Sequence, residues 1–96
     1  MTDAEILTML QADLGELFAN EARKTYLQQC ITSAREYITR EGVTLTDSVG
    51  DGQLVEMYAA YLVRKRATNE PMPRMLRWAL NNRLFSQKAQ VSGNAT

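Results

Sequence analysis

The side chains best suited to chemistry in this 96-residue chain are its arginines and a few carboxylates. The sequence has no histidine and only one cysteine, Cys30, so it lacks the commonest general base and the ligand spacings of zinc sites. No glycine-rich phosphate loop occurs, and no pair of carboxylates is spaced for acid–base catalysis. We therefore expect no enzyme activity and no catalytic, cofactor-binding or metal-binding residues.

Two of the carboxylates, Asp47 and Asp51, lie in a segment with loop chemistry that ends at Gly52. Its Asp-x-x-x-Asp-Gly order faintly resembles a calcium loop, but the third carboxylate and the distal glutamate of that motif are missing. Ser48 or Asp51 is better suited to cap the helix that follows. We expect Asp47 and Asp51 to belong to an exposed loop.

Most basic side chains gather in the second half of the chain. Arg64 to Arg66 is a wholly basic triplet that follows an apolar run, where cations favour the negative end of a helix dipole. A second set, in which three of the four side chains are basic, shares one face of a helical pattern by its spacing, namely Arg74, Arg77, Asn81 and Lys88. Such a stripe is either a solvated helix face or a docking surface for an acidic partner. Its composition does not decide between the two.

Large apolar side chains beside this stripe are further interface candidates. Trp78 is the only tryptophan, a residue type enriched in binding hot spots, although helix-to-helix packing explains it equally well. Met72 and Met75 lie beside a proline break, and methionine adapts readily to irregular surfaces. The residues that we expect at a subunit or partner interface are Arg64, Arg66, Met72, Arg74, Arg77, Trp78 and Arg83.

The elements that must position these side chains are four helices, which the hydrophobic periodicity predicts over residues 3–14, 20–41, 51–67 and 72–88. The third is central, because Leu54 to Val63 has a single charged residue and a helix that is apolar all round must be covered all round. Pro71 and Pro73 separate it from the fourth, since proline fits only the first turn of a helix. We expect one all-α domain over residues 1–96, with a flexible tail at 89–96.

Local signals place the ends of the first two helices. Thr2 precedes an acidic first turn and Asn20 precedes the second apolar pattern, so both are candidate helix caps. Gly15 is placed to end the first helix in the left-handed conformation. Between these helices, Leu17 and Phe18 are expected to form a turn that closes the edge of the core.

Charge is distributed unevenly although the net charge is zero. Residues 1–50 carry eight acidic and four basic side chains, a net of −4, and residues 51–96 carry three acidic and seven basic ones, a net of +4. This split favours head-to-tail contact between copies, which closes into a ring when the rotation permits. Mutual neutralisation of the two halves inside one monomer explains the split equally well.

The chain resembles the small head–tail connector proteins, or portal adaptors, of long-tailed bacteriophages and prophages. The resemblance is carried by Tyr58 to Arg66 and by Met72 to Phe85, with a similar plan around Ala34 to Ile38 in the first half. The resemblance covers roughly residues 3–88. It consists of a similar order of helices and similar short sequence segments, without a catalytic signature.

This resemblance implies a structural role in virion assembly. The family's subunits form a ring of twelve beneath the portal protein, extend the DNA channel and dock the next head-completion or tail protein. DNA would pass through without sequence recognition, so we expect a neutral or acidic lumen, lined partly by residues of the acidic first half or by the loop that holds Asp47 and Asp51. The expected location is the head–tail junction of the virion, after assembly in the bacterial cytoplasm. No run of 18 apolar residues occurs, and no membrane partner is expected.

The alternative is a small helical DNA-binding regulator. Its phosphate contacts would come from Arg64 to Arg66 and from the fourth predicted helix with Arg74, Arg77 and Arg83. Nucleic-acid-binding domains usually carry a basic excess, whereas this chain has none. The fourth helix also places Trp78 where a reading helix would present polar groups.

Overall fold

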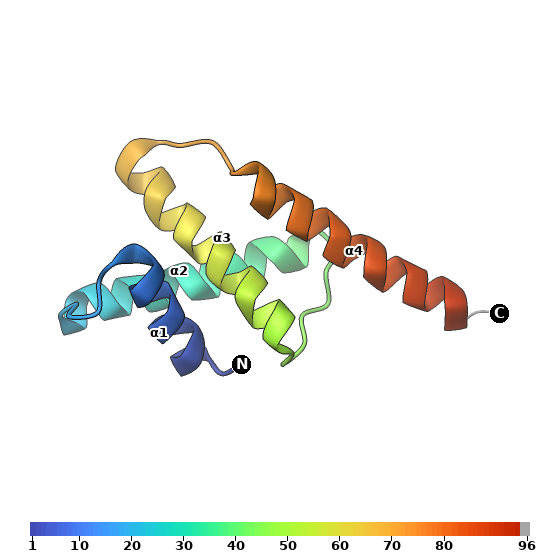
Figure 1. Ribbon diagram of the computed structural model, residues 1–96, viewed down its shortest axis with the longest axis horizontal. Coiled ribbons are helices and arrows are strands. Elements are labelled where there is room, and N and C mark those ends of the chain that lie inside the picture. Colours follow the sequence, from blue (N-terminus) through green and yellow to red (C-terminus); the bar gives the residue numbers. More distant parts are fainter. Residues whose placement is uncertain (95–96) are drawn as a thin grey trace.

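The computed structural model describes residues 1–94, with side chains described up to residue 90. Its helices are α1 (Asp3–Leu14), α2 (Glu21–Arg40), α3 (Val49–Thr68) and α4 (Arg74–Asn94). They form one compact domain without a strand in this part of the chain, so the predicted all-α fold class is confirmed. Figure 1 shows α3 crossing α2 with α1 beside it, and α4 running out from the body towards the C-terminus.

The helix starts follow local capping chemistry. Thr2 and Glu5 form a capping box, in which the Glu5 backbone N–H donates to Thr2 Oγ1 at 3.2 Å and the Thr2 N–H donates to Glu5 Oε1 at 2.9 Å. Asn20 Oδ1 accepts from the backbone N–H of Arg23 and caps α2. Gly15 ends α1 with φ 69°, which a residue without a Cβ adopts at no steric cost.

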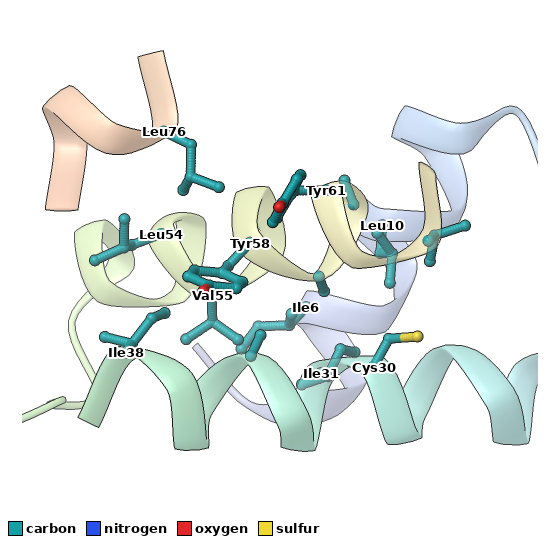
Figure 2. Packing of buried hydrophobic residues seen from close by; sticks show 14 of the residues in the cluster. Ile6, Leu10, Cys30, Ile31, Ile38, Leu54, Val55, Tyr58, Tyr61 and Leu76 are labelled. Atoms are coloured by element: carbon teal, nitrogen blue, oxygen red, sulfur yellow. The ribbon is translucent and has the colours of Figure 1, made fainter. Parts of the chain in front are cut away.

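Helix α3 is the centre of the core, as its apolar sequence predicts. Along it, Val55, Ala59 and Ala60 are at most 1% exposed. Side chains from the other three helices converge on it, as Figure 2 shows with Ile6 and Leu10 of α1, Ile31 and Ile38 of α2, and Leu76 of α4. Because neighbours cover the middle of α3, between residues 54 and 63, on several sides, most side chains of this stretch are buried.

Helix α3 also begins earlier than predicted, at Val49 instead of residue 51. Ser48 provides the cap, since its Oγ accepts from the backbone N–H of Asp51 at 3.1 Å. Glycines such as those at positions 50 and 52 are typical of loops. Here they lie in the first turn of α3, because the helix already begins after its cap, Ser48. Asp51 is therefore a helix residue and not part of the exposed loop that we expected.

Helix α4 packs against the body along one edge only, through Leu76 and Leu80, each 1% exposed. It begins at Arg74, later than predicted, because Met72 precedes a proline and such residues disfavour the helical conformation. It continues to Asn94, past the predicted end at residue 88, and no proline or glycine interrupts it before residue 93. Of the tail expected at 89–96, residues 95 and 96 lie outside the described part of the chain.

Candidate interaction surface

The outer face of α4 carries three large apolar side chains that no other helix covers. Met75, Trp78 and Phe85 are 67%, 64% and 74% exposed, respectively. Their spacing of three and seven residues places them on one side of the helix, away from Leu76 and Leu80 on the buried side. Exposed apolar residues scattered singly are ordinary, but three on one helix face form an apolar patch, which makes this face a candidate interaction surface. We call Met75, Trp78 and Phe85 the α4 face.

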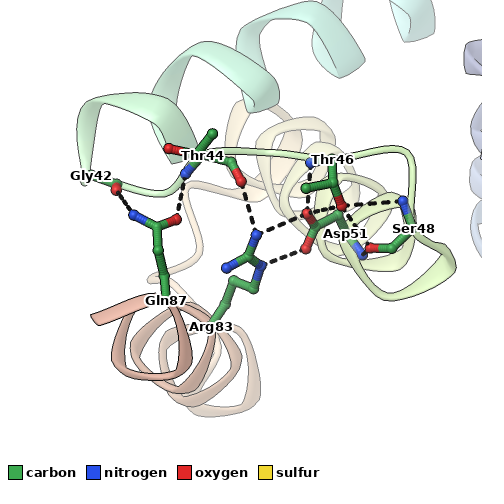
Figure 3. A network of polar contacts seen from close by, with 7 residues as sticks. All are labelled: Gly42, Thr44, Thr46, Ser48, Asp51, Arg83 and Gln87. Carbon is green, nitrogen blue, oxygen red and sulfur yellow. Dashed lines mark hydrogen bonds and ion pairs between the residues drawn. The ribbon is translucent and has the colours of Figure 1, made fainter. Parts of the chain in front are cut away.

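Arg83 lies on the inner side of α4, in the polar network that Figure 3 shows. Its Nε donates to Asp51 Oδ1 at 2.7 Å and its Nη2 to Asp51 Oδ2 at 3.1 Å and to the backbone oxygen of Thr44 at 2.8 Å. Gln87 adds a second link, accepting from the Thr44 N–H at 2.7 Å and donating to the backbone oxygen of Gly42 at 2.9 Å. Together they hold α4 against the segment between α2 and α3.

The carboxylate of Asp51 is the centre of this network. The backbone N–H and the hydroxyl of Thr46 both donate to its Oδ2, at 2.7 and 2.9 Å. Burial by itself would raise the pKa of Asp51, but the hydrogen bonds from Arg83 and Thr46 outweigh burial and lower it below its usual value. The Asp51 side chain is only 5% exposed. It is therefore not free to line a channel in this subunit, and Arg83 is committed to holding the fold together.

Arg77 is also engaged within the domain. Its Nη1 and Nη2 donate to the two carboxylate oxygens of Glu41 at 2.6 and 3.1 Å, a bidentate pair that ties α4 to the end of α2. The hydrogen bonds that Arg77 donates to Glu41 raise the pKa of Arg77 above its usual value. Of the predicted basic stripe, Arg74 and Lys88 are exposed and form no ion pair among the side chains described.

The basic end of α3 lies apart from the α4 stripe and contacts α1 and α2 instead. Arg64 lies 3.8 Å from Asp13 Oδ2 at the end of α1. The Arg66 guanidinium lies over the Tyr26 ring of α2, 5.5 Å from its centroid. Met72 is half-buried against the core. The seven predicted interface residues thus do not form one surface, and only Arg74 and Trp78 among them are both exposed and unpaired on α4.

Beside the α4 face, a groove of about 540 Å³ runs between α3 and α4. Its lining is mixed. Leu54, Met57 and Ala79 are apolar, whereas the polar lining residues are Thr46, Ser48, Asp51, Gln53, Arg83, Ser86 and Gln90. Ala79 follows Met75 by one helical turn, so the groove and the α4 face share an edge. A partner could therefore insert a side chain into the groove and also contact the exposed apolar side chains of the α4 face.

A second exposed apolar feature lies in the turn between α1 and α2. Leu17 is 61% exposed and Phe18 is 100% exposed. The prediction that they close the edge of the core is wrong, because the short turn carries them outward while the core is already closed by Leu10 and Leu27. We call Leu17 and Phe18 the turn knob. It lies at the opposite end of the molecule from the far end of α4 (Figure 1).

Asp47, the other predicted loop carboxylate, is exposed between α2 and α3. Its backbone oxygen accepts a hydrogen bond from the N-terminal amine of Met1 at 2.6 Å, which ties the start of the chain to this loop. Within the described residues, no three histidine, cysteine or acidic side chains gather as metal ligands would. None of the helices there is long and apolar enough to cross a membrane.

The search for relatives found no family model, curated protein or solved structure that matches this chain.

Proposed function

We propose that this chain is the subunit of a head–tail connector that forms a ring beneath a phage portal. In this role it extends the DNA channel and docks the next head-completion or tail protein. The support for this particular assembly is the sequence resemblance over Tyr58 to Arg66 and Met72 to Phe85. This role is structural and needs no catalysed reaction. The same contact repeats around the ring, and the summed binding free energy holds the assembly together.

The observation that supports this role best is the α4 face. A monomer of 96 residues buries only a modest fraction of its surface, and this one leaves Met75, Trp78 and Phe85 uncovered on a helix that projects from the body. Leaving them in water carries a cost in free energy that a partner surface removes. A helix held firmly by Arg83 and Gln87 on its inner side can present such a face rigidly.

The arrangement of charge fits a channel through which DNA slides. Arg77 and Arg83 are neutralised by carboxylates of the same subunit, so they offer few phosphate contacts that would hold the genome. Asp47 is the exposed carboxylate of the two that we predicted near the lumen. A channel lined by Asp47 and lacking Arg74 and Lys88 is the electrostatic arrangement that this proposal requires.

The test is assembly with the portal protein encoded by the same genome. We expect native mass spectrometry and electron microscopy to show a portal ring that carries about twelve copies of this chain. Trp78→Ala should reduce the number of copies retained, whereas the matched control Gln28→Ala, an exposed position on α2, should not. A portal ring that retains no copies of the natural chain contradicts the proposal.

The alternative, a DNA-binding regulator, has less support from the geometry. Of the cations it would use on α4, Arg77 and Arg83 are paired internally, which leaves Arg74 and Lys88. With two free cations among its described side chains, α4 by itself offers few phosphate contacts, and few contacts give little affinity at physiological salt. Fluorescence anisotropy with labelled duplex DNA separates the two functions: sequence-dependent binding at physiological salt favours the regulator, and its absence favours the connector.

A further inference from the structure

The turn knob and the α4 face are two exposed apolar surfaces that one copy cannot bring together. The turn between α1 and α2 lies towards one end of a molecule 52 Å long, and α4 extends to the other end (Figure 1). Each copy therefore carries one knob and one face, both uncovered. A protruding aromatic ring and an apolar helix face are complementary in chemistry, because contact between them removes apolar surface of both from water.

Charge is complementary at the same two places. Residues 3–22, which include α1 and the turn, carry five acidic side chains and no basic one, whereas residues 74–94 carry four basic side chains and no acidic one. Most of these charges have a partner within the same copy. Among the acidic side chains these are Asp3, Asp13, Glu16 and Glu21, and among the basic ones Arg77 and Arg83. Glu21 next to the knob is 93% exposed, although Lys24 lies 3.7 Å from it, and Arg74 beside the α4 face is exposed as well.

We infer that the turn knob of one copy docks on the α4 face of the next, with Phe18 entering the groove between α3 and α4. The contact is heterologous, because it joins two different surfaces, and repeating it leads from copy to copy around a closed ring or along a filament. This inference deepens the proposed connector function by naming the neighbour that occupies the α4 face. The apolar contact drives it, and Glu21 with Arg74 sets its orientation.

The contact involves few large side chains, so the area that it buries is well below the roughly 800 Å² per partner of a standard interface. A single contact between free copies is therefore weak. Copies held side by side on a ring-shaped partner repeat it at high effective concentration, and the assembly then becomes tight. Self-association in solution has to be tested with a method that detects weak binding.

Two single variants isolate the two surfaces. Phe18→Ser removes the aromatic ring of the turn knob and keeps the α4 face, and Trp78→Ala removes the largest side chain of the α4 face and keeps the turn knob. Because Phe18 is fully exposed and Trp78 is largely exposed, both variants should fold, which circular dichroism and thermal unfolding verify. We expect each variant to lose self-association, with at least a tenfold rise in the dissociation constant, since both residues are aromatic anchors of the contact.

The mixture of the two variants decides between arrangements. Isotope-labelled Phe18→Ser protein is titrated with unlabelled Trp78→Ala protein to about 1 mM, and amide chemical shifts are followed by NMR. We expect shifts at Met75, Trp78 and Phe85 in the labelled variant, and at residues 16–21 when the labels are exchanged. One intact knob then meets one intact face, and the complex stops at two chains.

Three outcomes would overturn this contact. Self-association of Phe18→Ser alone through α4 means that two α4 faces meet in a symmetric dimer. Shifts outside both surfaces mean that another interface is used, and no shifts at all mean that the copies do not meet in this way. The portal experiment is independent: a portal ring that binds natural copies while the knob contact fails removes this inference and leaves the proposed function in place.

Discussion

Glu56 should make the stability of this protein depend on pH in a range where few other groups titrate. It lies on α3, is 6% exposed, and its Oε1 has no hydrogen-bond partner in the structure. Burial, followed by interaction with the nearby Asp13 carboxyl, raises the pKa of Glu56 from 4.5 to about 7, while Arg64 opposes the shift. A carboxyl in this position holds its proton near neutral pH.

The direction of the effect follows from proton binding. Between pH 4.5 and about 7 the folded state keeps a proton on Glu56 that the unfolded state has released. The free energy of unfolding therefore falls as the pH rises through this range. A pKa difference of this size corresponds to about 3 kcal/mol at 1.36 kcal/mol per unit, which is an upper bound because Arg64 and water can adjust. The chain has no histidine, so no side chain of that type masks the slope.

The variant Glu56→Gln tests this reasoning. Its amide has nearly the same shape, cannot ionise, and can donate a hydrogen bond to the Asp13 carboxylate. We expect urea unfolding, followed by circular dichroism, to show that Glu56→Gln is more stable than the natural chain by about 1–3 kcal/mol at pH 8 and nearly equal to it at pH 5. Its stability should hardly change between these pH values.

The control is Glu36→Gln, which makes the same chemical change on α2 at a side chain that is 64% exposed. It should leave the fall in stability between pH 5 and 8 intact. If the natural chain is as stable at pH 8 as at pH 5, or if Glu56→Gln destabilises the protein at pH 8, then Glu56 is ionised and satisfied in solution and the reasoning is refuted.

Three further predictions concern the fold and its surface. Arg83→Ala leaves the Asp51 carboxylate buried without its partner and should cost about 2–4 kcal/mol, measured by urea unfolding, with α4 amides exchanging hydrogen faster. Tyr58→Ala should cost about 3 kcal/mol in the same assay because this ring is 7% exposed, whereas Trp78→Ala should cost under about 1 kcal/mol. Self-association should weaken as salt rises, since exposed charges are screened beyond roughly 10 Å at 0.1 M, and Arg74→Glu should weaken it at low salt in sedimentation experiments.

Each of these has a result that contradicts it. Unchanged stability of Arg83→Ala would mean that α4 is held by its apolar contacts alone. Equal losses for Tyr58→Ala and Trp78→Ala would mean that the α4 face is covered in solution. If neither salt nor Arg74→Glu changes the strength of self-association, the contact depends on apolar surface without a contribution from charge.

The charge split illustrates how tertiary structure decides between two interpretations of one sequence pattern. Part of the −4 and +4 halves is neutralised inside the monomer, since Arg77 pairs with Glu41 and Arg64 lies near Asp13. These partners are far apart in sequence, so composition could not identify them. Head-to-tail association therefore stays a prediction. The exposed turn knob and the α4 face support it more strongly than the net charges of the two halves do.

Local interactions made much of the fold predictable from the sequence. Asn20 and Ser48 cap helices through backbone groups three residues away, and Gly15 ends one by its own conformational freedom. The central position of α3 also followed from its composition, since a helix that is apolar on every side has to be covered by others. These signals act within a few residues, which is why the amino-acid sequence alone determines them.

The exposed surface was decided only by tertiary packing. Apolar residues on α4 cover more of the helix than one partner can bury, so periodicity could not tell that Leu76 would face α3 while Met75 and Trp78 face outward. Asp51 reads as a loop carboxylate until Arg83, 32 residues later, is brought against it. Which side chains remain exposed depends on how many neighbours the chain can supply, and in a chain of this length the core is complete before α4 is covered.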